Sequence, residues 1–198
     1  MKYIFALLVS VSFSVSQAQD MPAAKTAAPT AAPKSAVTPS PTAPIKDPVA
    51  TSVRMLLSRS QKNILGAIEA MPADKFAYKP TPEQMSFGHL VTHIIESNYL
   101  LCAKAADVPE PKAEPAKETD SKDKLLAATK ASFDFCGESL PKMEDSKLGD
   151  SIELFGGRQF PRAMAALGLA SGWADHYGAA AMYLRLNNIL PPSAQPKK

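Results

Sequence analysis

All three histidines of this 198-residue chain lie in two short motifs. His89 and His93 belong to the sequence SFGHLVTH at residues 86–93, and His176 belongs to DHYG at residues 175–178. Imidazole nitrogens are common ligands of zinc, nickel and other divalent metals, and they also act as general acids and bases. Two helices that carry these motifs would bring imidazoles together at one end of a bundle, which predicts a candidate metal centre.

Apolar residues recur at helical spacing in four stretches of the chain, with charged residues on the opposite side. Because one compact domain is expected from a chain of this length, the pattern predicts an all-α four-helix bundle. Residues around Gly156 and Gly157 are predicted to form a short extended excursion that covers one end of the bundle. The predicted helices cover residues 49–70, a stretch that begins between residues 82 and 87 and ends at 106, residues 121–140 and residues 161–188.

Two competing patterns mark the start of the second helix. Residues 81–84 have the form of a capping box with proline at the first helical position, whereas Ser86 is an alternative N-cap. Inside the helix, His89, His93 and Glu96 form a polar stripe that adjoins the apolar face. These side chains are therefore expected beside the core, where a bundle site would form.

The first 18 residues have the features of a signal peptide. An apolar run from Tyr3 to Val15 follows a lysine, and small residues at 16 and 18 stand where a signal peptidase cleaves. The run is shorter than the roughly 20 residues that cross a bilayer, and no cysteine follows the cleavage point to carry a lipid. We therefore expect an exported protein, periplasmic or secreted, with no stable membrane insertion.

Residues 19–48 are predicted to form a disordered linker, because they consist almost entirely of Ala, Pro, Thr, Ser and Lys. The bundle then occupies residues 49–193, and residues 194–198 form a basic tail. Cleavage of the leader removes Lys2 and lowers the formal charge from +3 to +2, which is too small for a nucleic-acid footprint. We expect no nucleic-acid partner, and the sequence leaves the oligomeric state open.

The two histidine motifs, together with YLRL at residues 183–186 and LPP at residues 190–192, resemble the DinB-like family of metal-dependent four-helix proteins. The resemblance covers about residues 49–193 and is greatest to the exported branch of the family. It implies helices in up-down-down-up order, with a long crossover between a parallel second and third helix. It also implies a divalent metal held by one histidine of the second helix and two of the fourth, spaced four residues apart.

This sequence carries only part of the ligand set that the resemblance implies. The first and last ligands match His93 and His176, but the middle one, four residues before His176, falls on Gly172. A catalytic zinc or nickel site ordinarily has about three protein ligands, so two imidazoles hold metal poorly and we expect low occupancy. Three nearby side chains are candidate substitute ligands: His89, Glu96 and Asp175.

Two classes of function remain open. The resemblance implies a divalent-metal-dependent thiol S-transferase or hydrolase, in which the metal lowers the pKa of a bound thiol or water. The glycine at position 172 favours instead a non-catalytic bundle whose vacated pocket binds a small ligand or persists only as structure. Four aromatic residues would lie near such a pocket, although aromatic residues at helical spacing are more often core: Tyr99, Trp173, Tyr177 and Tyr183. The sequence alone does not decide whether the protein is an enzyme.

Cys102 and Cys136 are the two cysteines of the chain. In an exported protein an even cysteine count favours a disulfide over two buried free thiols. Parallel second and third helices, as the resemblance implies, would place both cysteines at similar heights, because a helix rises about 1.5 Å per residue. Antiparallel helices would separate them by roughly 15 Å, beyond the ~7 Å limit on Cα separation for a bridge.

Overall fold

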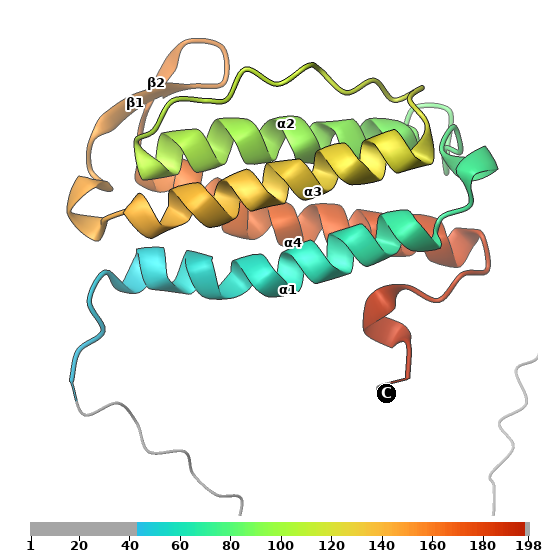
Figure 1. The fold of residues 1–198 in the computed structure, drawn as a ribbon, viewed down its shortest axis with the longest axis horizontal. Helices are drawn as coiled ribbons and strands as arrows, with labels where there is room; N and C mark the ends of the chain where they lie inside the picture. The colour runs from blue at the N-terminus through green and yellow to red at the C-terminus, as the bar shows by residue number, and fades with distance from the viewer. Residues whose placement is uncertain (1–42, 197–198) are drawn as a thin grey trace, which may run out of the picture. The chain divides into compact units, whose positions relative to one another are not determined.

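A computed structural model of the chain describes residues 43–196. The predicted signal peptide lies outside the described residues, as do the predicted linker up to residue 42 and the last two residues of the tail. None of the described helices is both long and apolar enough to span a membrane. The four long helices are α1 (Pro48–Ala70), α2 (Phe87–Ala106), α3 (Lys122–Ser139) and α4 (Ala163–Leu186) (Figure 1).

These helices confirm the predicted all-α bundle, and the ends fixed by the sequence pattern lie within two residues of those observed. Pro72 and Pro141 follow the ends of α1 and α3, where a proline disfavours further helix. Ser86 is the N-cap of α2, because its Oγ accepts a hydrogen bond from the backbone N–H of His89 at 3.0 Å. The competing pattern at residues 81–84 does not begin the helix.

The helices α2 and α3 run parallel, which gives the predicted up-down-down-up order (Figure 1). The Asn98 amide nitrogen donates to Ser132 Oγ at 3.0 Å, and one turn later Cys102 is bonded to Cys136. Both pairs have the same sequence separation of 34 residues, so the two helices advance in one direction. The connecting segment therefore returns along the bundle before α3 begins.

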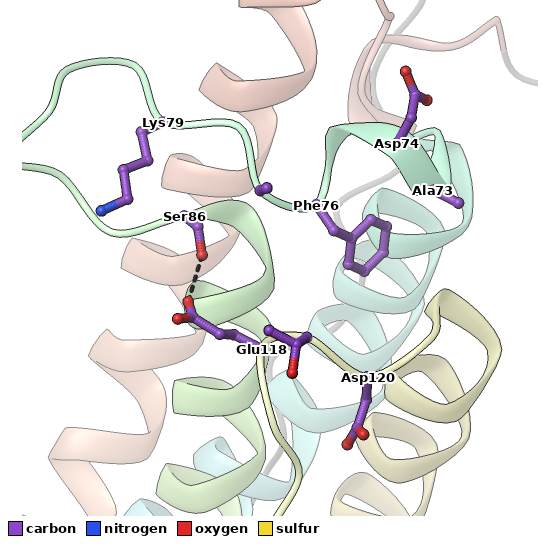
Figure 2. A pocket seen from close by; sticks show the side chains of 9 residues that line it. Ala73, Asp74, Phe76, Lys79, Ser86, Glu118 and Asp120 are labelled. Atoms are coloured by element: carbon purple, nitrogen blue, oxygen red, sulfur yellow. Dashed lines mark hydrogen bonds between the residues drawn. The ribbon is translucent and has the colours of Figure 1, made fainter.

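This crossover, residues 107–121, docks against the start of α2. Ser86 Oγ donates to Glu118 Oε2 at 2.7 Å (Figure 2). A Cβ added at Gly88 would lie 2.5 Å from the backbone oxygen of Glu118, far inside van der Waals contact. The absence of a side chain at Gly88 is therefore what allows the crossover backbone to approach the helix.

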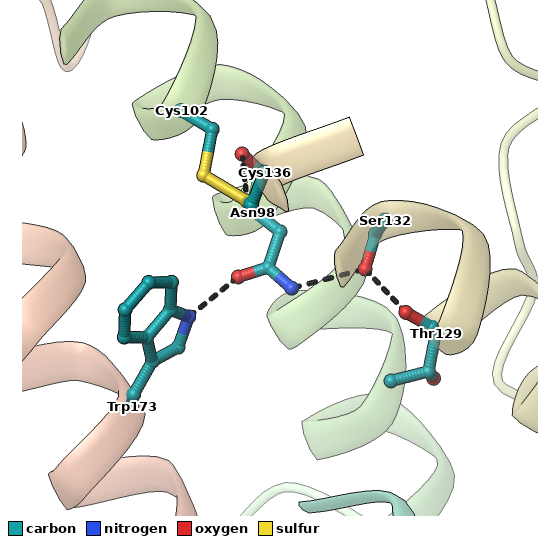
Figure 3. The surroundings of a disulfide bond; sticks show 6 residues. All are labelled: Asn98, Cys102, Thr129, Ser132, Cys136 and Trp173. Atoms are coloured by element: carbon teal, nitrogen blue, oxygen red, sulfur yellow. Dashed lines mark hydrogen bonds between the residues drawn. A yellow bond between two sulfur atoms is a disulfide. The ribbon is translucent and has the colours of Figure 1, made fainter. Parts of the chain in front are cut away.

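A chain of buried hydrogen bonds joins α4, α2 and α3 beside the disulfide (Figure 3). Trp173 Nε1 donates to Asn98 Oδ1 at 2.8 Å, and the nitrogen of the same amide donates to Ser132 Oγ. Ser132 Oγ donates in turn to the backbone oxygen of Thr129 at 2.8 Å. Both ends of the Asn98 amide have partners, as a buried polar group requires.

The buried face of α4 differs from the one that the spacing of small residues indicated. In the sequence, small residues recur at helical spacing and predict a closely packed inner face: Ala163, Ala166, Ala170, Ala174, Gly178 and Ala181. Ala174 and Gly178 are nevertheless exposed, whereas Leu169, Trp173 and Tyr183 are buried. The physical reason is the amount of apolar surface removed from water, which is larger for these side chains than for alanine or glycine. The rotation of α4 therefore follows its large residues.

Two short antiparallel strands, β1 (Ser151–Leu154) and β2 (Arg158–Pro161), form the predicted excursion around the glycine pair. Ile152 and Leu154 on β1 are buried and belong to the hydrophobic core. The hairpin is thereby fixed to the end of the bundle where α2 ends and α4 begins (Figure 1). Its tip, which contains Phe155, lies on the groove between those helices.

The disulfide between Cys102 and Cys136 is present with a Cα separation of 5.3 Å. We expect the double substitution Cys102→Ala/Cys136→Ala to lower the free energy of unfolding by roughly 2–4 kcal/mol, because the bridge restricts the unfolded chain. Denaturant unfolding of the variant and of the reduced wild type measures the loss. Thiol counting on unreduced, denatured protein should find no free thiol, and two titratable thiols would contradict the bridge.

Gly88→Ala should destabilise the protein by about 1–3 kcal/mol, because the crossover backbone must move to admit the methyl group. Gly137→Ala in α3 is the matched control, since its Cβ would meet only Leu57 at 3.9 Å. The control should be neutral or stabilising by up to about 1 kcal/mol from helix propensity. Equal stability of both variants in chemical unfolding would mean that the crossover does not press on Gly88.

Candidate metal centre

The structure brings His93 of α2 and His176 of α4 together. Their ring centroids are 4.9 Å apart and the rings meet edge to face, with an interplanar angle of 85°. The His93 residue is exposed and His176 is half-buried. Because α2 and α4 run in opposite directions, residues from one third of the way along α2 meet residues from the second half of α4.

Burial and a neighbouring imidazole act on His176 in the same direction. Desolvation lowers the pKa of His176 below its ordinary value of 6.5, and repulsion from His93 lowers it further, while the carboxylate of Asp175 partly opposes both. Burial disfavours the charged imidazolium, as does a second positive charge at this distance. The electrostatics therefore favour a neutral His176, which is the form that coordinates metals and accepts hydrogen bonds.

Gly172 lies one turn before His176 and directly beside its ring. A Cβ added at this glycine would lie 3.5 Å from His176 Cε1 and 3.7 Å from Nδ1, in ordinary van der Waals contact. A longer side chain at this position would therefore start at the histidine pair. The backbone at position 172 could therefore carry the third imidazole that the resemblance implies, but glycine has no side chain and so no metal-ligating atom.

Two cavities adjoin the histidine pair, and both imidazoles line both of them. The larger has a volume of about 460 Å³ and is also lined by Asp175, Ala179 and Tyr183. The smaller has a volume of about 180 Å³ and has a mainly apolar wall. The site thus opens on one side to a space with a mixed polar and apolar lining and on the other to a mainly apolar groove.

The three candidate substitute ligands lie in different places. His89 Nδ1 is 3.7 Å from Glu118 Oε2, so that ring is directed to the crossover. Glu96 is exposed and lines neither cavity, whereas Asp175 lines the larger cavity with both histidines. Within residues 43–196 no group of three or more His, Cys, Asp or Glu side chains is arranged to hold a metal ion. The donor set does not fit a site with three protein ligands.

Sequence reasoning missed two residues near these sites. Glu118 accepts from Ser86 and pairs with His89, yet it lies in a charged, proline-containing crossover where nothing distinguishes one acidic residue from another. It also lines a cavity of about 360 Å³ with Phe76 and Lys79 (Figure 2). Phe155 was included in the predicted excursion, but a strand pattern does not show where its tip points.

Comparison with known proteins agrees with this architecture. The sequence profile of the DinB superfamily matches residues 56–179, which is more than half of the chain. A DinB-like protein from Bacillus subtilis is 20% identical, with a TM-score of 0.57 over 74% of this chain and 99% of its own. A DinB-like protein from Bacillus cereus is 14% identical, with a TM-score of 0.58 over 72% and 95% of the two chains. Similarity at these identities concerns the fold alone. Among curated proteins no match was found.

The imidazole of His176 should titrate below pH 6.5, and His93→Gln should raise its pKa because one source of repulsion is removed. Asp175→Asn should lower the pKa further, since the opposing carboxylate charge is lost. The His176 imidazole binds a proton more readily in the unfolded chain than in the folded protein. The contribution of this residue to the free energy of unfolding therefore falls as the pH drops below 6.5. NMR titration of the ring protons measures each value, and an unchanged pKa in both variants would contradict this account.

Proposed function

Because this chain belongs to the DinB superfamily and carries Gly172 where the resemblance implies a third imidazole, we propose that its metal centre is degenerate. The proposed role is the binding of a small ligand, without metal-dependent catalysis. One observation carries the proposal: the Cβ position of Gly172 lies 3.5 Å from the His176 ring. A third imidazole at this position would start next to the histidine pair, so its absence removes a ligand from the same site. The space that a third imidazole would fill is open groove.

The chemistry of two imidazoles differs from that of three. Two neutral nitrogens leave zinc or nickel with most of its coordination positions to fill from solvent, so the ion exchanges readily and occupancy stays low. The same two rings offer hydrogen-bond donors and acceptors to an organic ligand. Low metal occupancy and ligand binding are therefore two consequences of one substitution.

A second candidate function is a divalent-metal-dependent thiol S-transferase or hydrolase with an altered ligand set. The observation that favours it is Asp175, which lines the larger cavity together with His93 and His176. A carboxylate oxygen is an acceptable ligand for zinc. Metal bound in this way would be lost on substitution of Asp175 by asparagine.

We also propose that the protein is exported, periplasmic or secreted. The disulfide between Cys102 and Cys136 supports this location, because disulfides persist in oxidising compartments and are rare where thiols are kept reduced. The signal peptide that would direct export falls on residues 1–18, outside the described residues.

The mature wild-type protein should retain little zinc or nickel after dialysis at neutral pH, and Gly172→His should bring the metal content close to stoichiometric. The new imidazole would start beside the His176 ring, where the Cβ has room. Elemental analysis of both proteins, with zinc and nickel offered separately, measures the difference.

Gly178→His is the matched control, because it adds an imidazole to the same helix at an exposed glycine with no atom within 4 Å of its Cβ. This control should bind no more metal than the wild type. Stoichiometric metal in the wild-type protein would overturn the proposal, and its loss in Asp175→Asn would then establish the altered site.

A further inference from the structure

The smaller cavity is a groove between α2 and α4 with the histidine pair at one end. His93 meets His176 there, and two turns further along Leu101 meets Gly168, whose Cβ would lie 3.4 Å from the leucine Cδ1. Eight residues of helix correspond to a length of roughly 12 Å. The groove is therefore elongated, with a polar end at the imidazoles and an apolar end at Leu101.

The lining between these ends is mainly apolar, and it also includes Ser97 and Asn98. Gly168 and Gly172 lie one turn apart on α4 and line the groove, with Leu101 next to the first glycine and the His176 ring next to the second, and Trp173 lies beside them. The Trp173 indole and the Asn98 amide are already hydrogen-bonded to each other, so they require no partner in the groove (Figure 3). No Lys, Arg, Asp or Glu is among the lining residues. A planar, uncharged molecule fits such a wall, because a buried charge without a partner is costly.

Phe155 lines the groove from the tip of the hairpin, where its ring meets Phe160 edge to face at a centroid distance of 5.9 Å. Its backbone has a φ of 45°, a left-handed conformation that is unfavourable for a residue other than glycine. The residue is also 50% exposed, so core burial does not account for a large aromatic side chain at this strained position. Strained residues of this kind cluster at ligand clamps.

We propose that the groove binds a neutral molecule with one aromatic ring, a hydroxyl at one end and a short apolar group at the other, as in a 4-alkylphenol. The hydroxyl meets the imidazoles of His93 and His176, which match its donor and its acceptor. The ring lies beside Gly172, between the imidazoles and Leu101 and against Trp173, and the apolar group reaches Phe155.

The size of the groove agrees with this ligand class. Apolar cavities of about 150 Å³ accept a benzene molecule, so the 180 Å³ of this groove admits a ring with small substituents. The inference rests on the proposed function, since a metal held tightly by the histidine pair would occupy the place of the hydroxyl.

Trp173 is the single tryptophan of the chain and lines the groove, so its fluorescence reports occupancy directly. Metal-free mature protein is titrated with 4-ethylphenol, phenol, ethylbenzene and 4-hydroxybenzoate. We expect saturable binding of 4-ethylphenol. Ethylbenzene should bind about tenfold more weakly because it makes no hydrogen bond to the imidazoles. The carboxylate of 4-hydroxybenzoate should weaken binding at least as much, since the groove offers it no cation.

Two substitutions test the orientation of the ligand. Phe155→Asn keeps a residue that tolerates the left-handed turn and removes the ring, so 4-ethylphenol should bind roughly fivefold more weakly while phenol, which does not reach the hairpin, is unaffected. Gly172→Leu fills the groove and should abolish binding of both phenols. Met182→Ala, at an exposed position on α4 outside the groove, is the control and should leave both affinities unchanged.

The inference would be overturned if none of the four compounds binds, or if ethylbenzene and 4-ethylphenol bind equally well. Both outcomes are measured on the wild-type protein, so they do not depend on the folding of any variant. An equal loss of phenol and 4-ethylphenol affinity in Phe155→Asn would overturn the proposed orientation. Elemental analysis separates the two proposals: metal-free wild type that binds no phenol contradicts only the ligand class, whereas stoichiometric metal contradicts the proposed function itself.

Discussion

The parallel pairing of α2 and α3 is the constraint on which the rest of the bundle depends. Parallel neighbours cannot be joined by a short turn, so the chain must travel back along α2, whose 20 residues correspond to about 30 Å. The crossover of residues 107–121 covers that distance and is received at the start of α2 by Gly88 and by the hydroxyl of Ser86. The covalent bridge between Cys102 and Cys136 holds the same two helices in register further along. Both ends of α2 are thus fixed by contacts that do not involve His93 or His176.

Besides the local cap at Ser86, several helix ends in this bundle are capped by residues that are distant in sequence. Arg162 donates to the backbone oxygen of Lys104 at 2.6 Å near the end of α2, and Lys122 donates to the oxygen of Met71 at 2.9 Å after the end of α1. Asp145 accepts from two backbone N–H groups in the first turn of α1. These side chains satisfy backbone groups that a helix leaves without partners, and they also tie neighbouring helices together. The arrangement leaves Arg162 Nε buried without a hydrogen bond, which carries a cost in free energy.

The sequence predicted the parts of this fold that rest on local pattern, including the four helices and the glycine turn of the hairpin. Helix order and the pairing of Cys102 with Cys136 were predictable through the family resemblance. The exposure of Ala174 was not, because a helical period identifies faces without stating which of two adjacent faces packs against its neighbours. The contact of His89 with Glu118 and the direction of Phe155 depend on how a crossover and a hairpin return to the bundle. Such tertiary contacts leave no periodic signal in the chain.

The proximity of His93 and His176 is maintained by packing and does not require a shared ligand. Trp173 precedes His176 by less than one turn and is held by Asn98, which follows His93 by little more than one turn. Asn98 is tied in turn to α3 through Ser132, so the anchors of the site are independent of the imidazoles. In a structural zinc domain, by contrast, metal binding supplies the folding free energy and the loss of a ligand unfolds the chain. The core positions both helices, so the bundle tolerates Gly172 beside the His176 ring, where this glycine forms part of the groove wall. If the metal centre is degenerate, as proposed, the change concerns what the site can bind, while the scaffold that presents the site remains.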